Sequence, residues 1–188
     1  METKKEIRSK MKRDRAALTH EVRQTWSDTI FEKVISHPLY RRAGEIYCYV
    51  SFGEEVSTGR LISYSLKMGK KVAVPKIIVD NGTKMKMEFY YIDSMEELQE
   101  GYYGIMEPPA KIKACGKDVL VIMPGVAFDV QCNRIGYGKG FYDSYLSVHP
   151  DYRRIALAYG MQCLKSIPAG EHDIRPEIIM TEEEDYIC

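Results

Sequence analysis

The spacing of apolar residues predicts a helix at the start of the chain. Ile7, Met11 and Leu18 recur on one helical face. Thr3 and Glu6 precede them with the spacing of a capping box, in which each side chain satisfies a free backbone amide of the first helical turn. A helix therefore begins just after Thr3.

A second helix is predicted directly after the first. Thr19 can cap its start, and the dipeptide His37–Pro38 ends it because the residue before proline avoids the helical conformation. The apolar residues between these signals recur every four positions: Val22, Trp26, Ile30 and Val34.

Beyond Gly44 the apolar period changes to two or to short continuous runs, which are typical of strands. We predict strands at residues 46–50, 71–74, 85–91, 119–123, 154–158 and 178–180. Pro75 is expected to end the second strand, and residues 80–82, Asp-Asn-Gly, to form a turn. Helices are predicted at residues 58–68 and 141–146. A second capping box at Ser94 and Glu97 predicts a helix of one or two turns that Gly101 closes, and residues 182–185 are expected to form a solvated tail.

These elements predict one α/β domain over residues 1–188. The five consecutive apolar residues at 119–123 indicate a strand covered on both faces, as in a parallel sheet. Strands alternate with helices, and no repeat, low-complexity tract or linker interrupts them.

Composition and charge narrow the class of protein. A hydrophobic content of 45% with 29% charged residues excludes wholesale disorder. The 27 basic and 27 acidic residues cancel, which argues against a large nucleic-acid surface. No stretch approaches the roughly 18–20 apolar residues of a membrane span, so we expect a cytoplasmic protein that binds neither nucleic acid nor membrane.

The cysteines and histidines form no recognisable metal site. The five cysteines are far apart in the sequence, without a CxxC pair, and we interpret them as reduced thiols, Cys132 included. The four histidines are equally scattered.

Residues 134–143, Arg-Ile-Gly-Tyr-Gly-Lys-Gly-Phe-Tyr-Asp, are the segment most suited to chemistry. Its three alternating glycines, within what we call the glycine loop (residues 136–140), allow backbone amides to approach an anion closely. Lys139 and Arg134 add two cations, and the predicted helix after the loop adds the partial positive charge of its start. A phosphate group is the expected ligand.

Two familiar phosphate motifs do not fit. The dinucleotide motif GxGxxG needs a glycine where Phe141 stands, and the Walker A motif needs Ser or Thr where Gly140 follows the lysine. A glycine-rich turn without a ligand is the alternative interpretation.

Other candidate residues are ambiguous by themselves. Asp143 could bridge a metal ion or only favour a helix start, and Asp173 could be a simple loop residue. Lys4 and Arg8 share a helix face that could be merely solvated. Glu55 follows a strand where an α/β crevice opens, although exposed loop acids are common there.

The pairing of Met123-Pro-Gly-Val-Ala-Phe-Asp129 with the segment 134–143 closely resembles the 5-formyltetrahydrofolate cyclo-ligase family, whose members are also called 5,10-methenyltetrahydrofolate synthetases. The resemblance extends over nearly the whole chain. Lys4 and Arg8 match the family's K-x-x-x-R, residues 55–58 resemble its E-x-x-T element, and residues 104–108 and 172–173 also look like family signatures.

The resemblance implies an ATP- and Mg²⁺-dependent enzyme that converts 5-formyltetrahydrofolate into 5,10-methenyltetrahydrofolate, ADP and phosphate. It also implies a three-layer Rossmann-like sandwich with a mostly parallel sheet, similar to sugar-phosphate isomerases and CoA transferases. The implied ATP-binding residues are Lys4, Arg8, Arg134, Ile135, Gly136, Tyr137, Gly138, Lys139, Gly140, Phe141 and Tyr142. The implied metal ligands are Asp143 and Asp173, the folate-binding residues Val50, Glu55 and Tyr137, and the catalytic residues Lys139, Arg134 and Glu55.

Several alternatives stay open at this point. An isomerase or acyl-CoA transferase of the same architecture would use the glycine loop for a phosphate that is not transferred. A binding module without catalysis would hold nucleotide or folate only. RNA binding through the basic first helix is disfavoured by the balanced charge. We expect a monomer.

Overall fold

The computed structural model describes residues 2–80 and 84–188. Its centre is a seven-stranded sheet with the strand order β12-β11-β9-β6-β1-β2-β3. The strands are β1 (Glu45–Cys48), β2 (Lys71–Asp80), β3 (Lys84–Ile92), β6 (Val119–Met123), β9 (Arg153–Leu157), β11 (Ile178–Met180) and β12 (Asp185–Ile187). All neighbouring strands are parallel except the two edge strands, β3 and β12. The sheet is therefore mostly parallel, as predicted.

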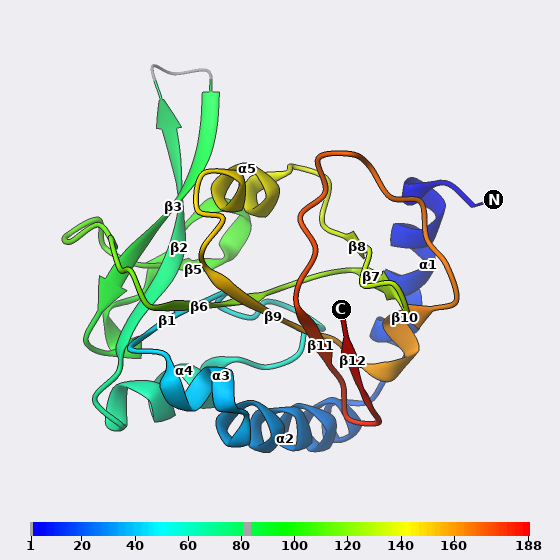
Figure 1. Ribbon diagram of the computed structural model, residues 1–188, viewed down its shortest axis with the longest axis horizontal. Coiled ribbons are helices and arrows are strands. Elements are labelled where there is room, and N and C mark those ends of the chain that lie inside the picture. Colours follow the sequence, from blue (N-terminus) through cyan, green and yellow to red (C-terminus); the bar gives the residue numbers. More distant parts are fainter. Residues whose placement is uncertain (1, 81–83) are drawn as a thin grey trace.

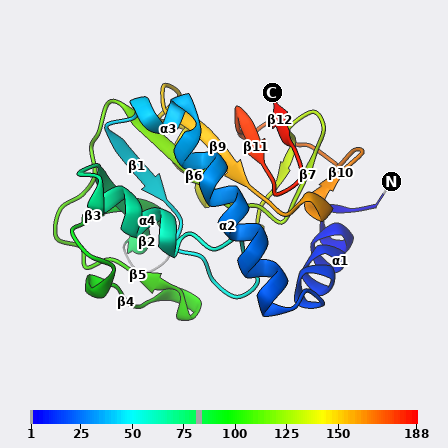
Figure 2. The ribbon, with the colours of Figure 1, turned by 90° about the horizontal axis from the view of Figure 1, so that it is seen from below.

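Helices cover both faces of this sheet. In Figure 1, α2 (His20–Ser36), α3 (Pro38–Arg42) and α4 (Gly59–Lys67) lie below it and α5 (Phe141–Ser147) lies above it; Figure 2 shows the three lower helices in front of the strands. Side chains alternate along β1, so that Ile46 joins the core under α2 while Tyr47 joins the core under α5. None of the described helices has the length and apolar character needed to cross a bilayer.

Helix α1 (Lys4–Ala16) lies apart from these layers, beside a small three-stranded sheet. That sheet has the order β10 (Cys163–Leu164), β7 (Ala127–Asp129), β8 (Arg134–Ile135). Ile7 and Met11 of α1 pack in one cluster with Ala127 and Ile135. This packing brings the charged side of α1 to the glycine loop, which connects β8 to α5.

Both predicted caps at the start of the chain are confirmed. Thr3 accepts a hydrogen bond from the Glu6 amide, and the Glu6 carboxylate accepts one from the Thr3 amide. Thr19 caps α2 through the Val22 amide. His37 is extended and ends α2, as predicted, and the short helix α3 follows at once with Pro38 in its first turn, where no backbone amide is needed.

The predicted end of a strand at Pro75 is wrong. Strand β2 continues through Pro75 to Asp80 and forms a long antiparallel hairpin with β3, in which Pro75 pairs with Phe89. Strand β1 pairs with β2 only as far as Ala73, so among the described residues the other side of β2 at Pro75 has no strand partner. A proline is tolerated at such a free edge. Of the predicted turn at residues 80–82, Asp80 is the last residue of β2, and residues 81–82 lie outside those described.

Two further local predictions are confirmed only in part. The capping box at Ser94 starts only the 3₁₀ turn η1 (Met95–Glu97), and the chain then enters β4 (Gln99–Glu100), which pairs with β5 (Met106–Glu107), instead of staying helical to Gly101. Turns η2 (Tyr102–Gly104) and η3 (Gly160–Gln162) complete the structure. Residues 183–185 are exposed, as expected, but they do not form a free tail, because the chain turns there and enters the edge strand β12.

The expectation that every cysteine is a free thiol is wrong for two of the five. Cys132 and Cys188 form a disulfide, while Cys48, Cys115 and Cys163 are free. The antiparallel pairing of β12 with β11 carries Cys188 back along the sheet, and its Cα atom lies 5.7 Å from that of Cys132. Because the partners are 56 residues apart, spacing alone gave no indication of the pair.

Candidate functional site

The glycine loop adopts a conformation that depends on glycine at two positions. Gly138 has a φ of +99° and Gly140 a φ of +67°. Side chains with a Cβ rarely adopt these left-handed values. The loop therefore presents its backbone directly, as expected for a segment that surrounds an anion.

Helix α1 is joined to this loop by charged side chains. The Arg8 Nε donates to the carbonyl of Gly136 at 2.7 Å. A Cβ on Gly138 would lie 3.5 Å from the Arg8 Cζ, so the guanidinium runs along the loop. One turn earlier, Lys4 Nζ pairs with the Asp173 carboxylate at 2.5 Å. The predicted basic face of α1 thus meets the predicted anion loop.

Arg134 does not present a free cation to solvent. Its residue is only 5% exposed, Nη2 pairs with Asp143 Oδ1 at 2.7 Å, and Nη1 donates to the Pro124 carbonyl at 3.3 Å. Asp143 Oδ1 also accepts the Ile174 amide at 2.9 Å. Arg134 consequently fixes Asp143, and its guanidinium lies against Gly136 of the loop.

The two candidate metal ligands lie close together because Ile174, which donates to Asp143, follows Asp173. In each carboxylate one oxygen holds the protein contacts: Oδ1 of Asp143, and Oδ2 of Asp173 with Lys4 and Gly170. Partial burial alone would raise the pKa of Asp173, but the hydrogen bonds from Lys4 and the Gly170 amide, together with the charges of Lys4 and Arg134, outweigh it and hold that pKa below its ordinary value. The pair fits a Mg²⁺ ion that takes few protein carboxylates and completes its shell with phosphate and water.

A second cluster joins Glu55, Tyr137 and Arg15. Tyr137 lies between two glycines of the loop and is 43% exposed, yet its hydroxyl points inward and accepts from both Nη atoms of Arg15 at 3.3 Å. Glu55, in the segment after β1, accepts the Phe52 amide at 2.8 Å and faces the same hydroxyl. The carboxyl end of β1 therefore meets the glycine loop here, as expected for a crevice in an α/β sheet.

The Glu55 carboxyl has a shifted pKa. Burial raises this pKa above its ordinary value, and the opposing effects of the Tyr137 hydroxyl, the Phe52 amide and the Arg15 charge only reduce the shift. Burial also raises the pKa of the Tyr137 hydroxyl, so it stays protonated at neutral pH. An acid with a raised pKa in a crevice is a typical mark of a functional site.

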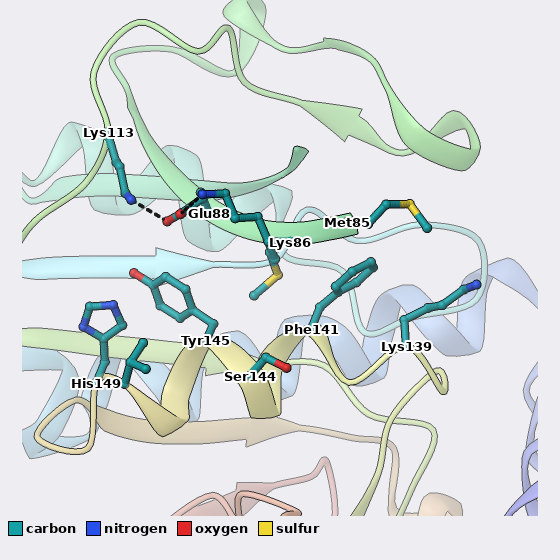
Figure 3. Close-up of a pocket in the computed structure, with 11 residues that line it drawn as sticks. Met85, Lys86, Glu88, Lys113, Lys139, Phe141, Ser144, Tyr145 and His149 are labelled. Carbon is teal, nitrogen blue, oxygen red and sulfur yellow. Dashed lines mark ion pairs between the residues drawn. The ribbon is translucent and has the colours of Figure 1, made fainter. Parts of the chain in front are cut away.

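Lys139 stands where the glycine loop meets a groove of about 430 Å³ between β3 and α5 (Figure 3). Phe141 and Tyr145 line the α5 side of this groove, and the Lys113–Glu88 ion pair, at 2.9 Å, lies at the end away from Lys139. Lys139 is exposed, and within the described ranges its ammonium has no ion-pair or hydrogen-bond partner. Its charge is therefore available to a ligand.

Comparison with known proteins identifies the class to which this site belongs. A model of the 5-formyltetrahydrofolate cyclo-ligase family matches residues 1–182. The chain belongs to this family.

Individual relatives agree over almost their full lengths. The chain is 29% identical to the "Probable 5-formyltetrahydrofolate cyclo-ligase" of Caenorhabditis elegans, over 99% of this chain and 96% of that protein. It is also 29% identical to the mouse 5-formyltetrahydrofolate cyclo-ligase, over 96% and 94% of the two chains. The structure superimposes on that of Aquifex aeolicus 5,10-methenyltetrahydrofolate synthetase with a TM-score of 0.85 and 29% identity, over 98% and 92% of the chains. The Mycoplasma pneumoniae synthetase, at 21% identity and a TM-score of 0.72, shares the fold.

Four other predicted site residues of this cyclo-ligase family member contribute in different ways. Val50 is partly buried against the core at the end of β1. Ile135 is 1% exposed, so only its backbone can face a ligand. Phe141 lines the groove, and the buried hydroxyl of Tyr142 has no hydrogen-bond partner in the part of the chain that the structure describes.

Sequence reasoning missed Arg15. It lies eleven residues after Lys4 and seven after Arg8, which places all three on one side of α1. Arg15 faces the Glu55 end of the site, while Lys4 and Arg8 face the loop and Asp173. Extending the helical spacing of Lys4 and Arg8 by two turns would have found it.

Proposed function

We propose that this chain converts 5-formyltetrahydrofolate and ATP into 5,10-methenyltetrahydrofolate, ADP and phosphate, and that the residues assembled around the glycine loop carry out this reaction. The family match over residues 1–182 carries the proposal. The convergence of a free lysine, two adjacent aspartates and a partly buried glutamate on one crevice supports it.

The chemistry needs activation of a poor leaving group. The formyl oxygen attacks the γ-phosphorus of ATP and the bond to the β,γ-bridging oxygen breaks, which releases ADP. The N10 amine then bonds to the formyl carbon and loses its proton, and the C–O bond breaks so that the former formyl oxygen leaves with phosphate. No covalent enzyme intermediate is required, and the protein mainly has to position the reactants and stabilise negative charge.

Phosphate binding is assigned to the glycine loop and α1. The backbone of residues 134–142 surrounds the phosphates, and Lys4 and Arg8 approach from the helix. Lys139 supplies the charge at the transferred group, because it is exposed and has no partner among the described residues. Arg134 acts beneath the loop by fixing Asp143. Preorganised charges of this kind stabilise a phosphoryl transition state more than the ground state.

Asp143 and Asp173 would hold Mg²⁺ through the carboxylate oxygens that the protein contacts leave free. When bound, this ion would neutralise charge on the ATP phosphates. Lys4 and Arg134 orient the two carboxylates, because each is hydrogen-bonded to one of them.

The folate is assigned to the other end of the crevice. Val50 and the exposed ring of Tyr137 offer apolar surface to it, and Glu55 offers a hydrogen-bond acceptor to its nitrogen-bound protons. With phosphates on the loop and folate against Glu55, Tyr137 would lie between the reacting halves. We further propose that the enzyme acts as a monomer in the cytoplasm.

A coupled assay tests the proposal. Purified protein is mixed with 5-formyltetrahydrofolate, Mg²⁺ and ATP, and methenyl absorbance and ADP are followed while each component is omitted in turn. The proposal expects equal amounts of both products, formed only in the complete mixture. Nucleotide binding without product would contradict it and favour a binding module, and product without ADP would exclude ATP activation.

A further inference from the structure

Arg15 carries a charge that the fold buries without pairing it to a carboxylate. The residue is 3% exposed, and among the described residues it belongs to no ion pair. Both Nη atoms donate to one acceptor, the Tyr137 hydroxyl, and the buried Nε has no partner within the described part of the chain. Desolvating a guanidinium costs several kcal/mol when no partner compensates it. An apolar residue would serve the core better, so the charge indicates a role in the site.

The contact with Arg15 determines how Tyr137 is presented. Tyr137 stands between Gly136 and Gly138, whose backbones restrain it little. Its ring is 43% exposed while its hydroxyl is held inside. The two hydrogen bonds from Arg15 therefore orient the one aromatic side chain that the glycine loop itself offers to a ligand.

Arg15 also faces Glu55. The titratable groups that act on Glu55 come from five parts of the fold. They are Arg15 from α1, Tyr137 from the glycine loop, Glu54 from the same segment as Glu55, Tyr49 from just after β1, and Tyr142 from α5. Of these, Arg15 alone is positively charged. Its charge therefore adds to the hydrogen bonds from the Tyr137 hydroxyl and the Phe52 amide, which also favour the ionised form of a carboxyl that burial disfavours.

We propose that Arg15 is a positioning residue for the folate half of the site: its two Nη atoms fix the Tyr137 ring, and its charge holds the Glu55 carboxylate ready to accept hydrogen bonds from the substrate. This proposal rests on the proposed function, since it assigns Tyr137 and Glu55 to the folate. Arg15 is assigned no contact with ATP, because it lies in the last turn of α1, at the opposite end of the helix from Lys4 and its partner Asp173.

The proposal has a pH signature. The Arg15 charge lowers the pKa of Glu55, which burial raises. Without that charge the pKa of Glu55 rises further, so the carboxylate is lost at a higher pH as the solution is acidified. The acidic limb of kcat/KM for folate should therefore move to higher pH when Arg15 becomes neutral. A role confined to packing would not move this limb.

The test compares Arg15→Met, which removes the charge, with Arg15→Lys, which keeps it but cannot donate in the same two-atom geometry. Arg13→Met is the matched control, since Arg13 is exposed in the same last turn of α1. We expect Arg15→Met to raise the KM for 5-formyltetrahydrofolate about tenfold, to leave the KM for ATP within about twofold, and to shift the acidic limb upward. Arg15→Lys should restore the limb and only part of the KM, and Arg13→Met should behave as wild type.

Failure of the inference is distinguishable from failure of the proposed function. If the wild-type chain forms no methenyl product, the function is wrong whatever Arg15 does. If the wild type is active and Arg15→Met changes only the melting temperature, with KM and pH profile unchanged, Arg15 is structural and the inference is overturned. Should Arg15→Met not fold, Arg15→Lys and Tyr137→Phe carry the test: their effects on folate KM should be non-additive, and additive effects would overturn the inference.

Discussion

Replacing Lys139 by alanine separates catalysis from stability. The lysine is exposed on the glycine loop, and within the described residues its ammonium makes no ion pair or hydrogen bond. Its loss should therefore change the free energy of unfolding by no more than about 0.5 kcal/mol, the usual range for an exposed position. Any loss of activity would then reflect the missing charge.

The expected magnitude follows from electrostatics. A unit charge about 4 Å from another interacts by about 4 kcal/mol at an effective dielectric constant of about 20. Only the part that grows between bound ATP and the transition state accelerates the reaction. Taking roughly two thirds of the interaction as this part gives about 2.7 kcal/mol, or a fall in turnover of about 100-fold.

Steady-state turnover of Lys139→Ala measures this effect, with ATP and folate both saturating and with the melting temperature recorded. Lys165→Ala, at another exposed position, is the matched control and should retain wild-type turnover. Lys139→Arg should recover part of the rate because it keeps the charge. Wild-type turnover in a folded Lys139→Ala variant would refute the role assigned to this lysine.

Three further predictions concern Glu55, Arg134 and the disulfide. Glu55→Gln should weaken folate binding without changing nucleotide binding, and it should raise the melting temperature of the free protein at pH 7 by roughly 2–4 °C, or about 1 kcal/mol. The reason is that the pKa of Glu55 is raised in the folded protein, so ionisation of Glu55 destabilises the fold as pH rises. In a calorimetric pH series the gain should therefore vanish below about pH 4. Arg134→Met leaves Asp143 without its buried partner and should lower stability by about 3 kcal/mol in urea denaturation; an unchanged midpoint would show that the pair is not structural. Reduction of the Cys132–Cys188 disulfide should lower the free energy of unfolding by about 3 kcal/mol. The same treatment with reductant should not change the stability of the Cys188→Ser variant. If reductant destabilised both proteins equally, the disulfide would not be the cause.

The parts of the fold that follow from local rules could be predicted from the sequence. The capping box at Thr3 and Glu6 and the continuous apolar run at 119–123 each act within a few residues, and both are confirmed. Pro75 was misjudged because its tolerance depends on which side of β2 carries a neighbouring strand, a property of the sheet as a whole.

The site was predictable in part for the same reason. The glycine spacing indicated an anion loop, and the helical spacing of Lys4 and Arg8 placed both on one face. The sequence could not indicate that Arg134 is buried against Asp143, because this depends on the small sheet that β8 joins. It could not indicate the raised pKa of Glu55 either, since that shift comes from burial beneath other elements.

The most direct test of the account follows the formyl oxygen. 5-Formyltetrahydrofolate labelled with ¹⁸O in the formyl group is converted with unlabelled ATP, and the inorganic phosphate is analysed by mass spectrometry beside the ADP formed. The account predicts one ¹⁸O atom in each phosphate and one ADP per methenyl product. Unlabelled phosphate accompanying product would contradict transfer of the phosphoryl group to the formyl oxygen, and the assignments of Lys139 and the glycine loop would fall with it.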